Sequence, residues 1–123
     1  MKKLNKDNIS EFLQYYHDFH DSYVVNICYD IVNSRIEILL DIVWSGKPVL
    51  KGKTYETNTV HLKLVCYSVC KYMGKNISSW EYINKCFLDC INFEGEKKLC
   101  FATAKDDPLV YVVCDAIEYE EVA

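Results

Sequence analysis

The chain has 123 residues, half of them hydrophobic and 14% aromatic, so it holds enough apolar material for one packed domain over residues 1–123 and is not a disordered chain. Its 18 acidic and 14 basic side chains give a net charge of −4, which argues against a partner that is a nucleic acid. Residues 1–10 carry basic side chains with no apolar stretch behind them, and no later run is long enough to span a membrane. We therefore expect a cytoplasmic protein without a membrane partner.

The first predicted element is a helix over residues 8–19, "NISEFLQYYHDF". Asn8 and Glu11 have the spacing of a capping box, in which the two side chains bond each other's backbone amides. The apolar side chains recur three or four residues apart, which places them on one stripe of a helix. They are Ile9, Phe12, Leu13 and Tyr16. This stripe predicts a helix that lies on a flat apolar surface.

A hairpin is predicted directly after the helix, because the apolar pattern changes to period two at Tyr23. In the first strand we expect Val25, Ile27 and Tyr29 on one face and the residues between them on the other. The letters "VNSR" indicate a turn. The second strand has one almost purely apolar face, made of Ile36, Ile38, Leu40, Ile42 and Trp44.

The remainder of the chain predicts further strands joined by short connections. Residues 47–57 suggest an irregular connection, "YMGKN" a break and "SSWEYINK" a short helical turn. The predicted strands span residues 60–69, 87–94, 98–104 and 109–118. Because the chain has no crossover helices, these strands favour an antiparallel arrangement. The fold class is therefore α+β, with the N-terminal helix packed on a curled, mostly antiparallel sheet of about six strands, either a half-barrel or a sandwich.

The seven cysteines do not form a recognised metal or disulfide pattern. Cys66 with Cys70, and Cys86 with Cys90, make two C-x3-C pairs, whereas zinc ribbons use C-x2-C. Several cysteines fall in apolar alternating runs, where a free thiol behaves as a small hydrophobic group. We expect reduced, buried thiols and no metal or other cofactor; a metal site or a disulfide framework is the alternative.

The stretch His20-Asp21-Ser22 contains the three residue types of a hydrolytic triad. Consecutive residues of an extended chain point to opposite faces, so they cannot easily form a triad, and no nucleophile elbow surrounds Ser22. We instead expect a structural corner, in which Asp21 and Ser22 accept backbone amides and His20 packs against the sheet. A metal site of His17, His20 and Asp21 is a further alternative if the helix continues to residue 21.

Binding residues are predicted at two places in the sequence. Trp80 opens a loop or short turn, where an aromatic ring is available for contact, and Glu118, Glu120 and Glu121 form a candidate acidic patch near the C-terminus. Ten tyrosines add rigid rings with polar ends, which suit protein contact surfaces. These features favour a protein partner with a basic surface.

The stretch "FHDSYVVNICYDIVNSRIEI", from Phe19 to Ile38, resembles small bacterial proteins that have a helix, an HDS corner and a hairpin. Members of the immunity-protein groups of polymorphic-toxin systems are among them. "CDAIEYEE" resembles a closing strand of the same group. The resemblance implies a protein that binds and neutralises a toxin, and it supplies no catalytic residues.

Together these observations predict a non-enzymatic cytoplasmic binding protein, with an immunity protein as the specific role implied by the resemblance. The alternative is a small-molecule binder or enzyme that uses the mouth of a curled β-sheet. A homodimer formed through an exposed edge strand is a third arrangement to test.

Overall fold

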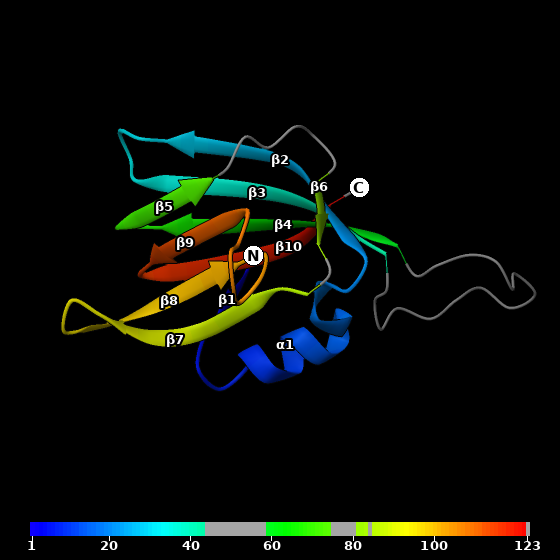
Figure 1. Cartoon of the computed structure of the whole chain (residues 1–123), viewed down its shortest axis with the longest axis horizontal. Coiled ribbons are helices and arrows are strands. Elements are labelled where there is room, and N and C mark those ends of the chain that lie inside the picture. The colour runs from blue at the N-terminus through cyan, green and yellow to red at the C-terminus, as the bar shows by residue number, and fades with distance from the viewer. Residues whose placement is uncertain (44–58, 75–80, 84, 123) are drawn as a thin grey trace, which may run out of the picture.

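Two antiparallel sheets face each other across a shared apolar core, and one short helix lies beside them (Figure 1). The computed structural model describes residues 1–43, 59–74, 81–83 and 85–122. Within them, no helix is long and apolar enough to cross a membrane. The architecture confirms the α+β class, with two open sheets in a sandwich arrangement.

The first sheet has six strands and the second has four, all paired antiparallel. In spatial order the first contains β1 (Lys2–Leu4), β10 (Ala116–Val122), β4 (Val60–Tyr67), β3 (Arg35–Ile42), β2 (Ser22–Asp30) and β6 (Glu81–Ile83). The second contains β5 (Lys71–Gly74), β9 (Val110–Cys114), β8 (Glu96–Ala102) and β7 (Phe87–Phe93).

Strand β3 follows the predicted alternation closely. Ile36, Ile38, Leu40 and Ile42 are all 0% exposed, and they pair across to buried residues of β4. The predicted face of β2 is wrong in part, because a bulge between Val24 and Asn26 shifts the register. A bulge adds one residue to one strand and so exchanges the faces beyond it.

The chain passes between the sheets at two points that the sequence pattern does not reveal. The predicted strand over 109–118 is two strands, β9 and β10, which lie in different sheets and are separated by Asp115. The predicted strand over 60–69 ends at Tyr67, and Ser68 has a positive φ of 52° where the chain leaves for β5. The Asp115 amide donates to the Tyr67 carbonyl (3.1 Å), so the two crossings are bonded together.

Several other local predictions need correction. Strand β1 was not predicted, because its three residues carry no recognisable pattern. The predicted break at "YMGKN" falls partly in strand β5. The predicted helical turn at "SSWEYINK" falls partly in strand β6. The turn between β7 and β8 centres on Glu94 and Gly95, both with positive φ, a conformation that glycine adopts without steric cost. Trp44 and the predicted connection over 47–57 lie outside the described residues.

The helix α1 (Ile9–Tyr15) closes one open side of the sandwich, and a one-turn helix η1 (His17–Phe19) follows it (Figure 1). The predicted apolar stripe is confirmed, since Phe12 packs on Tyr119 of β10 with ring centroids 4.6 Å apart. The predicted capping box is wrong. The side chain of Asn8 makes no cap bond; it accepts the Asn5 amide and donates to the Lys3 carbonyl instead.

Candidate functional site

The corner between α1 and β2 is built around a left-handed backbone. His17, Asp18 and Phe19 all have φ between 52° and 59°, and Asp21 has φ 59°. This conformation is costly for residues with a Cβ, so packing must hold it in place. Phe19 provides that packing: it is 0% exposed, with its ring 5.8 Å from Phe12. The corner is therefore a structural feature anchored by Phe19.

His20 is not buried against the sheet, as the sequence predicted, because its side chain is 48% exposed. Its Nε2 lies 3.4 Å from Oδ2 of Asp21, and the other oxygen of Asp21 accepts a hydrogen bond from the Tyr82 hydroxyl. This contact raises the pKa of Tyr82, with the hydrogen bond as the largest cause. Asp21 thus connects the corner to β6.

Ser22 opens β2 and pairs with Ile83 of β6. The residue is 0% exposed, and its Oγ has no hydrogen-bond partner, so the expected turn bond to a backbone amide is absent. A nucleophile must be reachable by substrate and must contact its base. Ser22 is enclosed, whereas His20 faces solvent and contacts Asp21, so the three side chains do not form a triad.

The helical spacing that would gather His17, His20 and Asp21 around a metal is not formed, because α1 ends at Tyr15. The described residues contain no group of three or more potential metal ligands.

All seven cysteines are free thiols. Three of them are buried as expected, but Cys28 and Cys70 are exposed. Burial raises the pKa of Cys100 to about 11 and raises the pKa of Cys86 further. A nucleophilic cysteine needs a lowered pKa, so these two thiols are structural groups.

A groove of about 860 Å³ lies between α1 and the adjoining ends of β1 and β10. Its walls are aromatic and acidic. The residues that line it are Met1, Lys2, Asn8, Glu11, Phe12, Tyr15, Tyr16, Tyr119, Glu120 and Glu121. We call this hollow the α1–β10 groove.

One carboxylate of the groove is held in place by the helix. The Tyr16 hydroxyl donates to Oε1 of Glu121 at 3.0 Å, and burial followed by this bond raises the pKa of Tyr16. Tyr15 packs edge-on against Tyr16, with centroids 4.8 Å apart, and remains 41% exposed. The groove therefore presents a positioned carboxylate beside an exposed aromatic ring.

The three predicted glutamates do not share one face. Glu118 and Glu120 lie on the outer face of β10, whereas Glu121 points to the other face, toward α1. Two of the three, Glu120 and Glu121, line the α1–β10 groove. Trp80 lies outside the described residues. The sequence did not predict that Glu11 and Tyr15 line a groove. The available signal was the position of these polar residues beside the apolar stripe of α1.

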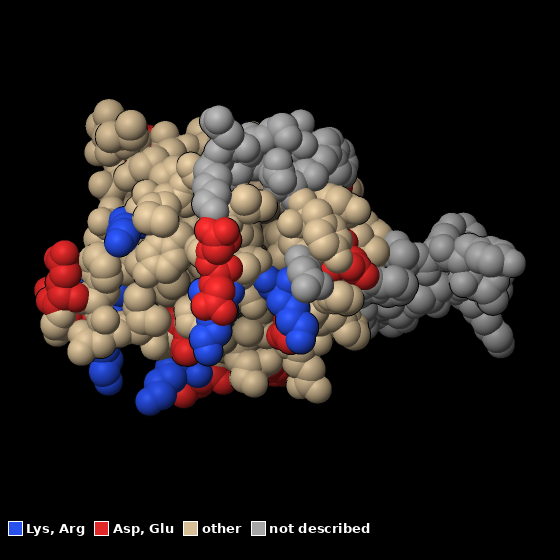
Figure 2. Space-filling model, viewed as in Figure 1, with Lys and Arg blue, Asp and Glu red and all other residues tan. Residues whose placement is uncertain are grey.

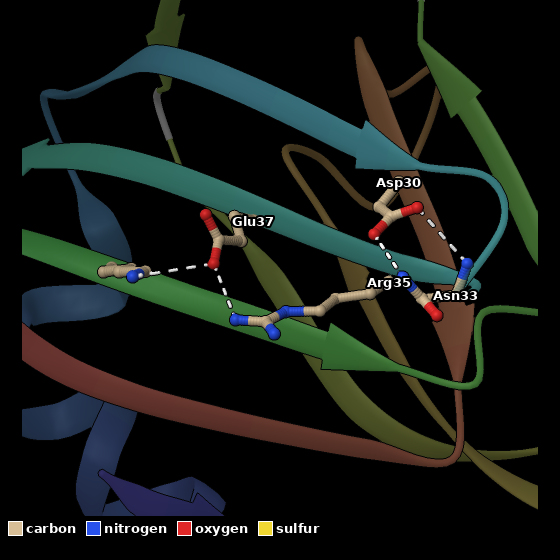
Figure 3. Close-up of polar contacts among 5 residues, drawn as sticks. Asp30, Asn33, Arg35 and Glu37 are labelled. Carbon is tan, nitrogen blue, oxygen red and sulfur yellow. Dashed lines mark hydrogen bonds and ion pairs between the residues drawn. The ribbon is translucent and has the colours of Figure 1, made fainter.

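Other acidic residues of the first sheet already have partners on its outer face (Figure 3). Glu37 accepts from Arg35 at 2.7 Å and lies 3.6 Å from Lys63. Asp30 accepts from the side chain and amide of Asn33, and these bonds lower its pKa. Among the residues that the structure describes, no ion pair joins Glu11, Glu120 or Glu121 of the groove to a basic side chain.

The face toward the viewer in Figure 2 lies over β5, β9 and β8 and is mostly uncharged, with charged side chains of both signs in several separate places. A second hollow, of about 480 Å³, lies between Tyr82, Cys86 and the loop that contains Lys105. Lys85, Lys105 and Asp107 line it, so its lining carries more positive than negative side chains. Of these two hollows, the α1–β10 groove is the one in which carboxylates are in excess.

The chain matches no family model, and no curated protein or solved structure is significantly similar to it.

Proposed function

We propose that this chain is a non-enzymatic cytoplasmic protein that binds a basic surface of another protein through the α1–β10 groove. The observation that carries the proposal is the groove itself, whose lining holds three glutamates, one lysine and the amine of Met1 among aromatic side chains. Opposite charge speeds and orients the encounter of two proteins, and exposed tyrosine rings supply contact area with little loss of conformational freedom.

The packing of the core supports contact rather than chemistry as the mode of action. The space between the two sheets is filled by apolar side chains, among them Ile38, Leu64, Phe101 and Val112, each 0% exposed. A small-molecule site in the mouth of the sheet would need polar groups that converge on an enclosed cavity. The α1–β10 groove is instead an open surface, which suits a segment of another protein.

Immunity to a toxin is the specific role that we propose, and it rests on the resemblance over Phe19 to Ile38. In this structure that stretch forms the corner and the β2–β3 hairpin, which belong to the scaffold. The resemblance therefore supports the role, whereas the groove supports the mode of binding.

Co-expression tests this function directly. The chain is produced in a bacterial host together with the product of the gene adjacent to it in its source genome, under separate inducible promoters. We expect growth to be rescued by the wild-type chain and lost when Glu11, Glu120 and Glu121 are all changed to Gln. Glu118→Gln, a charge loss on the same strand outside the groove, serves as the matched control. Unrescued growth with the wild-type chain, despite normal expression, would contradict the proposal.

A further inference from the structure

The strand β10 has an unpaired side within the α1–β10 groove. Strand β1 covers β10 only as far as the pair of Lys2 with Tyr119. Beyond it, Glu120 to Val122 pair with β4, and no described strand lies on their other side. A short piece of open sheet edge therefore borders the groove.

The direction of the backbone groups at this edge follows from one side-chain bond. The Lys3 carbonyl accepts from Asn8 Nδ2, so it points away from β10. In an antiparallel pair, residues alternate between those that bond the partner strand and those that point away from it. Lys3 lies opposite Glu118, so Tyr119 and Glu121 direct their backbone groups toward β1. The N–H and C=O of Glu121 therefore lie past the end of β1, on the open side.

The edge strands β1 and β7 each have a backbone group bonded to a side chain, which distinguishes them from this edge. Asn8 covers part of β1, and on the edge strand β7 the Cys90 amide donates to Oδ1 of Asp89. Such contacts occupy backbone groups that could otherwise pair with another strand. No comparable side-chain bond to the backbone of Glu121 is present in the described part of the chain.

Resting on the proposed function, we infer that the α1–β10 groove takes an extended, arginine-bearing segment of the partner protein, which pairs with β10 at Glu121. Main-chain bonds give such strand addition its affinity, and side-chain pockets give it its specificity. An arginine on the segment would meet the carboxylate of Glu121 and the exposed ring of Tyr15. A guanidinium suits both, because it bonds carboxylates in a planar fork and stacks on aromatic rings.

Charge complementarity selects this occupant. Glu11, Glu120 and Glu121 outnumber the two positive groups on the lining, Lys2 and the amine of Met1, so an acidic segment would add to an excess of carboxylates. Glu121 is also held by Tyr16, so less side-chain freedom is lost when a guanidinium binds it.

The experiment uses the full chain, labelled with ¹⁵N, and the peptide acetyl-Val-Arg-Val-Arg-Val-amide as the probe. We expect chemical-shift changes that centre on the amides of Glu121 and Tyr15 and saturate with the peptide. Glu121→Gln should weaken binding about three- to tenfold, since an amide keeps the Tyr16 bond but loses the charge. Glu118→Gln should leave binding unchanged. Replacing both arginines by glutamate should abolish it, and N-methylation of the peptide backbone should weaken it.

Shift changes elsewhere on the chain, or equal losses for Glu118→Gln and Glu121→Gln, would overturn the inference. Its failure can be told apart from failure of the proposed function. If the neighbouring toxin is neutralised but Glu121→Gln has no effect on either assay, only the groove assignment is wrong. If the peptide binds as expected but no toxin is neutralised, the groove stands and the immunity role fails.

Discussion

The corner at His20-Asp21-Ser22 and the α1–β10 groove differ in how their residues come together. The corner uses consecutive residues whose letters suggest catalysis, yet the three side chains go to different surroundings: His20 faces solvent, Ser22 is enclosed, and Asp21 bonds Tyr82. The groove has no motif, yet Tyr16 and Glu121 meet across 105 residues of sequence. Chemistry depends on which side chains converge in space, and adjacency in the chain often prevents convergence.

The two regions also hold their shape differently. The corner depends on a buried ring, Phe19, which fixes a backbone conformation that is unfavourable by itself. The groove depends on an exposed ring, Tyr15, and on a carboxylate held by one hydroxyl. Substitutions at the corner should therefore change stability, whereas substitutions at the groove should mainly change binding.

The largest effect is expected for Phe19→Ala. Removing a fully buried phenylalanine leaves a cavity and releases the left-handed turn, so the free energy of unfolding should fall by about 3–5 kcal/mol. Urea denaturation followed by circular dichroism measures the change.

Tyr15→Ala is the matched control on the groove side. Its ring is 41% exposed, so the loss of stability should stay below about 1 kcal/mol. Equal losses of stability in Phe19→Ala and Tyr15→Ala would show that the groove supports the fold as much as the corner does, and would contradict the expected difference between the two regions.

Tyr16→Phe tests the bond that positions Glu121. At neutral pH the variant should be less stable by about 1 kcal/mol, the usual value of one hydrogen bond. Burial and Glu121 raise the pKa of Tyr16 in the folded chain above its ordinary value of 10.0. Below pH 10 the stabilising contribution of this residue is complete. Above it, the unfolded chain releases the proton first, so wild-type stability falls as pH rises.

The difference between wild type and Tyr16→Phe should therefore shrink above about pH 10, by at most about 1.4 kcal/mol per pH unit. Urea midpoints of both chains between pH 7 and 11 provide the measurement. A difference that stays constant over this range would show that the hydroxyl is not held in the folded chain.

The predictable parts of the fold are those where a strand has neighbours on both sides and one buried face. Strand β3 lies between β2 and β4, and its alternation from Ile36 to Ile42 was correctly read from the sequence. Strand β1 has three residues, two of them exposed lysines, so its place beside β10 is decided by tertiary pairing. The alternation shifts by one residue where the chain changes sheets, since Val112 and Cys114 enter the core on β9 and Ile117 does so on β10. The apolar residues Val113 and Ala116 conceal this shift in the sequence.

The candidate groove was predicted only in part for a related reason. Glu120 and Glu121 were identified as acidic neighbours, but their side chains go to opposite faces of β10. What joins them to Glu11 and Tyr15 is the docking of α1 against β10, through Phe12 and Tyr119. Docking of two distant elements depends on the whole core and leaves no local pattern in the sequence.

Asp21→Ala should cost about 1 kcal/mol. Asp21 has a φ of 59°, which aspartate tolerates better than alanine, and it accepts the Tyr82 hydroxyl. Asp21→Gly removes the same acceptor but adopts positive φ freely, so it should cost less than Asp21→Ala. Thermal unfolding of both variants measures this order, and equal losses would show that φ is not the source.

The smallest effect, with the opposite sign, is expected for Ser22→Ala. The Ser22 hydroxyl is fully buried without a partner, and an unsatisfied buried polar group costs free energy in the folded state. Replacing it by a methyl group removes that cost and loses no bond, so stability should be unchanged or rise by up to about 1 kcal/mol.

A catalytic Ser22 would behave differently: the variant would lose a hydrolytic activity that the wild-type chain shows against p-nitrophenyl acetate or a casein substrate. Denaturation and both assays on the wild type, Ser22→Ala and the exposed control Ser10→Ala separate the two readings. A loss of more than about 1 kcal/mol in Ser22→Ala would mean that the hydroxyl has a bonding partner in solution, and the corner would then be held by its polar groups as well as by Phe19.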